Sequence, residues 1–193
     1  MTVTLESLNA ATLASQRDLH TAGFWNEGSR LTRTDVFWCS YPLITSPNAS
    51  GLFYHGTGWL DSILGFIAGH IFIPRWSLSM PRGKNDSLRD IVRHEYGHAV
   101  AHHYPMLIQR SERFRETFGG DYNAFEHSRA GEHDEFVSKY AQTDPAEDFA
   151  ETFMMNLKHR GTLPSKFKNP TIKRKWRFIL DLGKIVRTGE SKW

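Results

Sequence analysis

Two histidines and a glutamate lie close together in the segment His94-Glu95-Tyr96-Gly97-His98, which has the pattern H-E-x-x-H. On an α-helix, residues four apart share one face, so both imidazoles can reach a single metal ion. Two neutral imidazoles at this spacing suit Zn²⁺, and the glutamate beside the first histidine lies near an open coordination position. There it can take a proton from water on the metal and pass it to a leaving amine. The pattern therefore predicts a zinc site for hydrolysis.

The helix that must carry this motif has recognisable boundaries. It can begin at any of three favourable N-cap residues, Asn85, Asp86 or Ser87, and no proline follows until Pro105. Gly97 costs roughly 1 kcal/mol relative to alanine inside a helix, so we expect another segment to approach closely there. The apolar residues gather on the side away from the two histidines: Leu88, Val92, Tyr96, Ala99 and Val100. The alternative is a core helix in which the two histidines have no function. It does not explain why both imidazoles and Glu95 lie away from the apolar side of the helix.

A catalytic zinc usually has three protein ligands and keeps a fourth position for water, so a third ligand is needed. His102 lies eight residues after His94. That is about 12 Å along the helix axis, too far for the two side chains to share one ion. The metzincin spacing would require Gly at position 101 and His at position 104, where the chain has Ala101 and Tyr104. We therefore expect His102 and His103 to pack beside the site or to be exposed rather than to bind the metal.

Two later segments offer acidic residues. The cluster Glu132-His133-Asp134-Glu135 follows a glycine in a polar stretch and is typical of the exposed start of a helix. A second helix should begin at Asp144, a favourable N-cap, with Pro145 as its first residue. The second segment is the stronger candidate for the third ligand.

In this second helix, Glu147 and Glu151 share one face, and Phe149 and Phe153 share another. A carboxylate in the first turn can meet the metal. The carboxylate one turn later can accept the free N–H of a ligating histidine and so fix its tautomer. An exposed acidic face would explain the charges, but it does not explain the paired phenylalanines or the preceding Tyr140.

These motifs resemble those of the gluzincins, zinc peptidases that hold the metal with two histidines and one glutamate. The stretch Tyr140–Phe153 is similar to two groups within that clan. One is the catalytic domain of anthrax lethal factor, in which a tyrosine stands seven residues before the ligand glutamate, as Tyr140 stands before Glu147. The other is the bacterial family called "putative zinc-binding metallo-peptidase". It shares R-H-E-x-G-H, the F-R-x-x-F-G of residues 114–119, and Y-A-x-x-x-P-x-E-D-F-A-E-T-F.

The resemblance covers Val92 to Phe153 and implies a role for each matched residue. Glu95 would be the general base, Tyr140 would donate to the developing oxyanion, and Glu151 would hold a ligating histidine. The implied ligands of a single zinc ion are His94, His98 and Glu147. Three weaker candidates for contacts with substrate or with a ligand are His127, His133 and Asp148.

The strands that precede the metal helix are short and aromatic. Asp35–Ser40, Leu52–Tyr54 and Ile67–Trp76 are predicted strands, separated by proline and glycine turns. In gluzincins the strand just before the metal helix is an edge strand that pairs with extended substrate. His70–Pro74 is placed for this role through Ile71, Phe72 and Ile73, although an ordinary core hairpin would look the same. We expect an α+β, zincin-like fold with a small antiparallel sheet first and a mainly helical C-terminal half.

The length of 193 residues suits one hydrophobic core, so we expect a single domain over 1–193 with an N-terminal helix within 1–25. Cys39 is the one cysteine, which excludes a disulfide framework, and its aromatic neighbours indicate a buried thiol. The N-terminal residues lack the apolar core of a signal peptide, and no run of 18 apolar residues occurs. We therefore expect a cytoplasmic protein, with signal-independent export left open.

The charge is distributed unevenly. The formal net charge is +3, yet residues 158–193 contain 11 Lys and Arg against 2 acidic residues. Lys173–Arg177, with Lys184 and Arg187, forms a basic helix. Its apolar residues should pack inward: Trp176, Ile179, Leu180 and Leu182. The basic face is either simply solvated or a surface that contacts an acidic partner, nucleic acid or anionic lipid, although no known nucleic-acid motif occurs.

The sequence thus predicts a zinc-dependent metalloendopeptidase, a hydrolase with one Zn²⁺ per chain and a peptide or protein as substrate. Two alternatives stay open. One is a regulatory peptidase similar to the ImmA/IrrE group, whose F-A-x-x-L-L-M-P is partly matched around Phe149-Ala150-Glu151 and Met154-Met155, without the proline. The other is a zinc-stabilised binding module without catalysis, in which the basic helix makes the contact.

Overall fold

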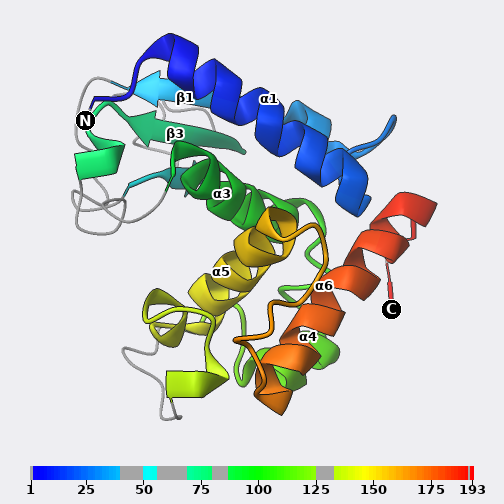
Figure 1. Ribbon diagram of the computed structural model, residues 1–193. Helices are drawn as coiled ribbons and strands as arrows, with labels where there is room; N and C mark the ends of the chain where they lie inside the picture. The colour runs from blue at the N-terminus through cyan, green and yellow to red at the C-terminus, as the bar shows by residue number, and fades with distance from the viewer. Residues whose placement is uncertain (1, 40–49, 56–68, 80–86, 125–132, 191) are drawn as a thin grey trace.

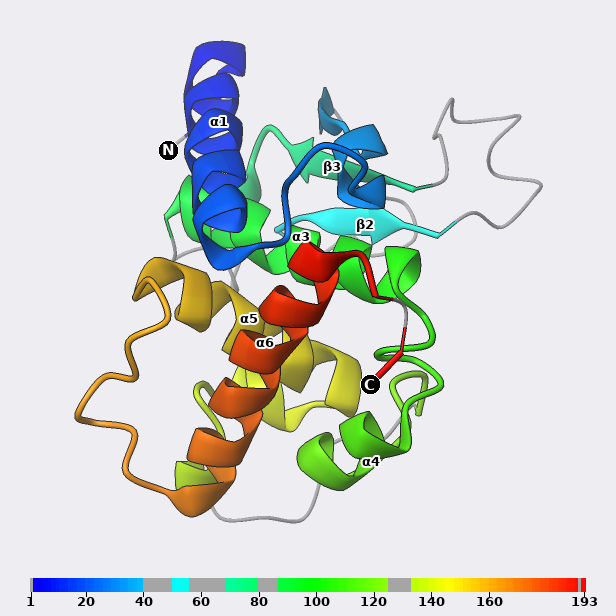
Figure 2. The same cartoon turned by 90° about the vertical axis from the view of Figure 1, so that its right-hand side faces the viewer.

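The computed structural model describes residues 2–39, 50–55, 69–79, 87–124, 133–190 and 192–193. In Figures 1 and 2, one helix, α3 (Leu88–His103), runs between two groups of elements. The first group contains α1 (Leu5–Ala22) and the strands β1 (Val36–Cys39), β2 (Leu52–Tyr54) and β3 (His70–Pro74). The second contains α4 (Glu112–Phe118), α5 (Pro145–Lys158) and α6 (Pro170–Thr188). Short 3₁₀ turns are η1 (Arg30–Arg33), η2 (Ser77–Ser79), η4 (His133–Glu135) and η5 (Tyr140–Gln142). The fold is α+β and mostly helical, as predicted.

The sheet differs from the expectation in two respects. Its order is β1-β3-β2, with β1 parallel to β3 and β2 antiparallel to β3, so the sheet is mixed rather than antiparallel. The second difference concerns Ile71, Phe72 and Ile73, which were predicted to form an edge strand. They pair on both sides and are buried, so that prediction is wrong. A continuous apolar run such as Ile71-Phe72-Ile73 is typical of a strand with partners on both sides, so the sequence did contain a signal for the central position.

Helix α3 begins and ends where the sequence predicts. Ser87 is the N-cap, its hydroxyl accepting the Asp90 N–H, and the helix ends at His103; the other two N-cap candidates lie outside the described residues. A Cβ on Gly97 would lie 3.0 Å from the Cα of Ala150, which confirms the expected close approach and identifies α5 as the neighbour. The predicted apolar face is buried throughout.

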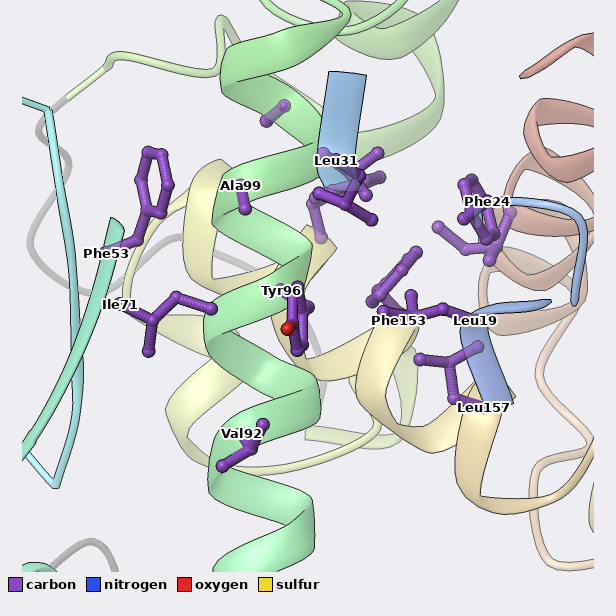
Figure 3. Packing of buried hydrophobic residues seen from close by; sticks show 14 of the residues in the cluster. Leu19, Phe24, Leu31, Phe53, Ile71, Val92, Tyr96, Ala99, Phe153 and Leu157 are labelled. Atoms are coloured by element: carbon purple, nitrogen blue, oxygen red, sulfur yellow. The ribbon is translucent and has the colours of Figure 1, made fainter. Parts of the chain in front are cut away.

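The hydrophobic core surrounds α3 on two sides. Figure 3 shows Tyr96 and Ala99 between the sheet residues Phe53 and Ile71 and the helical residue Phe153. Phe153 packs edge to face on Phe24, with ring centroids 5.0 Å apart. Because α3 is covered both by the sheet and by α5, its histidine face is held at a fixed orientation.

The terminal helices follow the predicted pattern with two exceptions. In α6, Trp176, Ile179 and Leu182 are buried, but Leu180 is 39% exposed, so its predicted inward packing is wrong. Lys175, expected on the solvated basic face, is 2% exposed, and its Nζ lies 2.8 Å from Asp148 Oδ2 in α5. An opposite charge inside the protein therefore draws one lysine inward.

Two smaller expectations concern the thiol and the membrane. Cys39 is half-buried, and burial raises its pKa to about 11, so the thiol is protonated at neutral pH. The prediction of a buried thiol is thus confirmed only in part, since Cys39 is of intermediate exposure. None of the described helices is both long and apolar enough to cross a membrane.

Candidate metal centre

Two facing helices supply the side chains of the site. α3 carries His94 and His98 one turn apart. α5 begins with Asp144 as its N-cap, whose Oδ1 accepts the Glu147 N–H at 2.9 Å, so Glu147 lies in the first turn. The absence of a side chain at Gly97 lets α5 approach α3 closely.

The three candidate ligand atoms converge. His94 Nε2 lies 3.1 Å from His98 Nε2. Glu147 Oε2 lies 3.0 Å from His94 Nε2 and 3.6 Å from His98 Nε2. Donor atoms about 2.0–2.1 Å from a tetrahedral zinc ion would lie about 3.3 Å from one another. Among the described residues, His94, His98 and Glu147 form the group that could hold a metal ion, and their spacing fits zinc.

The outer nitrogens of the two imidazoles are also held. His94 Nδ1 lies 2.8 Å from Glu151 Oε1. A carboxylate accepts, so His94 Nδ1 carries the proton and Nε2 presents its lone pair to the site. His98 Nδ1 lies 2.9 Å from the hydroxyl of Tyr122. A hydroxyl can accept as well as donate, so His98 can adopt the matching tautomer.

The electrostatics of the partners suit a cation. Burial raises the pKa of Tyr122 well above its usual value, so this residue stays a neutral phenol beside His98. Burial would also raise the pKa of Glu147, but the imidazoles of His98 and His94 outweigh that effect and hold it well below its usual range. Glu147 is therefore a carboxylate at neutral pH. A carboxylate and two imidazole lone pairs that share one small space are stabilised by a bound cation.

Glu95 lies on the same helix, between the histidines. It is 2% exposed, and its Oε2 accepts the backbone N–H of Phe53 in β2 at 2.8 Å. A Cβ on Gly51 would lie 2.8 Å from Glu95 Oε1, so only glycine fits there without displacing the carboxylate. The end of β2 therefore fixes the position of Glu95.

A cleft of about 390 Å³ opens beside these groups. Tyr140, in η5, lies on its wall, with its ring centroid 6.0 Å from that of His94. The wall is formed by β2, α3, α5 and η5, and it includes Gly51, Phe53, His55, Glu95, Tyr140 and Glu147. His98 also lines the cleft, so a substrate there would touch the predicted base, two predicted ligands (His98 and Glu147) and the predicted oxyanion donor.

Glu151 has a second contact that ties the site to Tyr140. Its Oε2 accepts from the Ser138 hydroxyl at 2.6 Å, and Ser138 Oγ in turn accepts the Ala141 N–H at 3.1 Å. The carboxylate that orients His94 thus also fixes the turn that carries Tyr140.

The weaker sequence candidates lie elsewhere. Asp148 is fully buried in its ion pair with Lys175, so its predicted contact with substrate is wrong. His133 is exposed at the start of η4, and His127 lies outside the described residues. His103 Nε2 lies 2.8 Å from Thr34 Oγ1, in agreement with a packing role.

Sequence reasoning missed three contributors: Tyr122, Ser138 and the β2 backbone at residues 51–53. Tyr122 stands three residues after the F-R-x-x-F-G motif, so its proximity to a recognised motif was an available signal. Ser138 and a backbone N–H have no side-chain pattern that distinguishes them.

The comparisons agree with the geometry. Residues 85–173 match the family model described as "Putative zinc-binding metallo-peptidase". The match includes both histidines and all three glutamates of the site (Glu95, Glu147 and Glu151), and it confirms the resemblance inferred from the motifs. No curated protein and no solved structure matches the chain. The resemblance to anthrax lethal factor stays a prediction.

Proposed function

We propose that this protein is a zinc-dependent metalloendopeptidase with one Zn²⁺ per chain. The observation that supports this best is the convergence of His94, His98 and Glu147, two of which (His98 and Glu147) line an open cleft together with the buried Glu95. A structural zinc usually has four protein ligands, whereas three ligands beside a cleft leave one position for water or substrate.

Each residue would then have one task in hydrolysis of a peptide bond. Zn²⁺, when bound, would polarise the scissile carbonyl and lower the pKa of water. Glu95, held by the Phe53 N–H, would accept a proton from the attacking water and deliver it to the leaving nitrogen. Tyr140 would donate to the carbonyl oxygen as negative charge develops there. Glu151 and Tyr122 would keep the two imidazoles in the ligating tautomer.

The substrate would lie along β2 rather than β3. Among the described residues, β3 has partners on both sides and β2 pairs with β3 alone, and the residues of β2 line the cleft. The Phe53 N–H that reaches Glu95 points away from β3, so this side of β2 faces the catalytic groups. An extended peptide added at this edge would bind mainly through its backbone. We therefore expect broad recognition of extended chain rather than of one side chain.

The decisive experiment is cleavage of a diverse peptide library by the zinc-loaded protein and by Glu95→Gln at matched zinc content. The control is Glu116→Gln, an exposed residue of α4. We expect Glu95→Gln to lose cleavage and Glu116→Gln to retain it. Equal cleavage by all three proteins would refute the proposal. No cleavage by any of them, with one zinc bound per chain, would favour the non-catalytic binding module.

Gly51→Ala tests the placement of Glu95 without removing its carboxylate. The added Cβ would lie 2.8 Å from Glu95 Oε1 and must displace it. We expect kcat to fall by about tenfold or more, since small misplacements of catalytic groups are costly, while zinc content stays unchanged. Gly28→Ala, at a glycine with open space around it but with φ 90, measures the effect of an added methyl group together with backbone strain away from the site, and it should leave kcat unchanged. An unchanged kcat in Gly51→Ala would argue against Glu95 as the base.

A further inference from the structure

A second cavity lies on the far part of the helical region, between α1, α5 and α6. Its volume is about 600 Å³, within the usual range for small-ligand sites. Residues of all three helices line it, and Figure 2 shows how α1, α5 and α6 are arranged. It shares no lining residue with the cleft beside Glu95. The start of α5 borders that cleft and its end, at Asn156 and Leu157, borders this cavity, so about 14 Å of helix separates the two.

The walls of this cavity are strongly basic. Five cationic side chains line it, against one carboxylate, Asp18. Asp18 is already paired, since its Oδ1 lies 2.6 Å from Arg89 Nη2. Within the described part of the chain, no carboxylate forms an ion pair with the other three guanidinium groups on the wall, which are Arg17, Arg160 and Arg187. The cavity therefore presents positive charge that the surrounding protein does not neutralise.

The floor of the cavity is apolar. Phe24, Leu157 and Ile179 line it and are each at most 2% exposed. Leu180, whose exposure contradicts the amphipathic pattern of α6, lines the same cavity. A mostly hidden apolar floor under a basic rim suits a molecule with one apolar part and one anionic part.

Two further features indicate a binding site rather than a packing gap. Asn156 lines the cavity at 2% exposure, and its Nδ2 has no hydrogen-bond partner among the described residues. Such buried donors are rare in native proteins. Arg160 has φ 51, a left-handed conformation that is uncommon outside glycine, and strained residues of this kind cluster at ligand sites.

We propose that this cavity binds an organic phosphate of about nucleotide size, with the phosphate groups on the arginines and the apolar body on the floor. Guanidinium groups favour phosphate because their planar forks donate two parallel hydrogen bonds to its oxygens. Three of them suit a multiply charged group better than a single carboxylate. The inference does not depend on peptidase activity, because none of these residues belongs to the metal centre.

The test is binding of ADP to the zinc-loaded full chain by calorimetry, beside pyrophosphate and adenosine as the anionic and apolar parts. We expect ADP to bind more tightly than either part, since both regions of the cavity then contribute. Arg17→Gln combined with Arg160→Asn should weaken ADP binding by about tenfold or more, because charge-assisted contacts are removed. Asparagine at position 160 retains tolerance of positive φ.

The matched control removes two exposed charges of α6 that do not line the cavity, Lys173→Gln with Arg177→Gln. The control pair should weaken ADP binding by less than about twofold, because these two charges attract the anion only from a distance and are screened by salt. Arg17→Gln alone, on the exposed surface of α1, is a second variant that leaves α5 unchanged. Three results would each overturn the proposal. These are no ADP binding at millimolar concentration, a control pair that weakens ADP binding as much as the arginine variants do, and a polyglutamate peptide that binds more tightly than ADP. The last result would indicate an acidic protein partner.

Discussion

Two buried polar clusters lie side by side on α3, and they are built differently. In the first, which we call the ion cluster, Arg93 lies 2.6 Å from Asp90 and 2.8 Å from Asp18. Lys158 and Arg89 complete it, at 2.7 Å from Asp90 and 2.6 Å from Asp18. Each buried carboxylate in this cluster therefore contacts two cations.

The second cluster begins at the next residue. His94, His98 and Glu147 bring two imidazole nitrogens and a carboxylate oxygen together, and their outer partners fix protons on the far side. Consecutive helical residues point about 100° apart, so the two clusters face different parts of the protein. The two clusters thus differ in how their charges are balanced: the carboxylates of the ion cluster are paired with cationic side chains of the protein, whereas the histidine cluster has the arrangement of a site that could hold a metal ion.

The largest expected effect is that of zinc on stability. Zinc at about a thousandfold excess over its Kd should raise the free energy of unfolding by about 4 kcal/mol. Glu147→Gln should lose most of this gain, because one ligand is missing, while Glu116→Gln should keep it. Denaturant unfolding with and without zinc measures both. An equal gain in Glu147→Gln would remove Glu147 from the ligand set and with it the contrast between the clusters.

The ion cluster should respond in the opposite way. Arg93→Met should lower the free energy of unfolding by about 3 kcal/mol, since it leaves buried carboxylates with fewer cations. The loss should be the same with and without zinc, because the Arg93 guanidinium binds Asp18 and Asp90, which are not among the proposed ligands. Arg115→Met removes an exposed pair with Asp121 and should cost much less. A zinc-dependent loss in Arg93→Met would show that the two clusters are coupled.

The hydroxyl of Tyr122 should affect metal affinity more than the fold. Tyr122→Phe removes the partner of His98 Nδ1 and should weaken zinc binding by about 10–100-fold. Tyr104→Phe is the matched change, because its hydroxyl contacts Ser29 away from the site. Competition with a chromophoric chelator gives both affinities. Equal zinc affinity in the two variants would mean that His98 needs no such partner.

The smallest effect concerns pH and a histidine outside both clusters. Partial burial, followed by nearby His102 and Arg30, lowers the pKa of His103 from 6.5 to about 4. The unfolded chain then binds the proton more readily, so stability is present above pH 6.5 and is lost as the pH falls toward about 4. His103→Gln should make zinc-free stability less dependent on pH in this window. His133→Gln, an exposed change, should leave that dependence unaltered; the reverse result would contradict the assignment.

The helices and most of the site could be predicted because their signals are local. Ser87, Asp144 and Pro145 are capping residues whose effect depends on the next few residues, and the structure has all three in those positions. The four-residue spacing within one helix likewise predicted that Glu147 and Glu151 share a face. Gly97 indicated a close neighbour, although not which one.

The errors came from pairings between distant residues. The parallel pairing of β1 with β3 joins segments about 35 residues apart, and nothing in either strand specifies its partner. The exposure of Leu180 and the burial of Lys175 likewise depend on what packs against α6, namely an open cavity on one side and Asp148 on the other.

The sequence by itself determined which side chains form the candidate metal site, because helical periodicity brings residues four apart together wherever the helix lies. It therefore specified two histidines on one face, two glutamates on another helix, and the family that shares them. The tertiary structure decided which groups complete the site: Tyr122 beside His98, Ser138 beside Glu151, and the β2 backbone beside Glu95. These contacts join residues 13 to 42 positions apart in the chain. Contacts between residues so far apart depend on how the core packs rather than on local conformational preference.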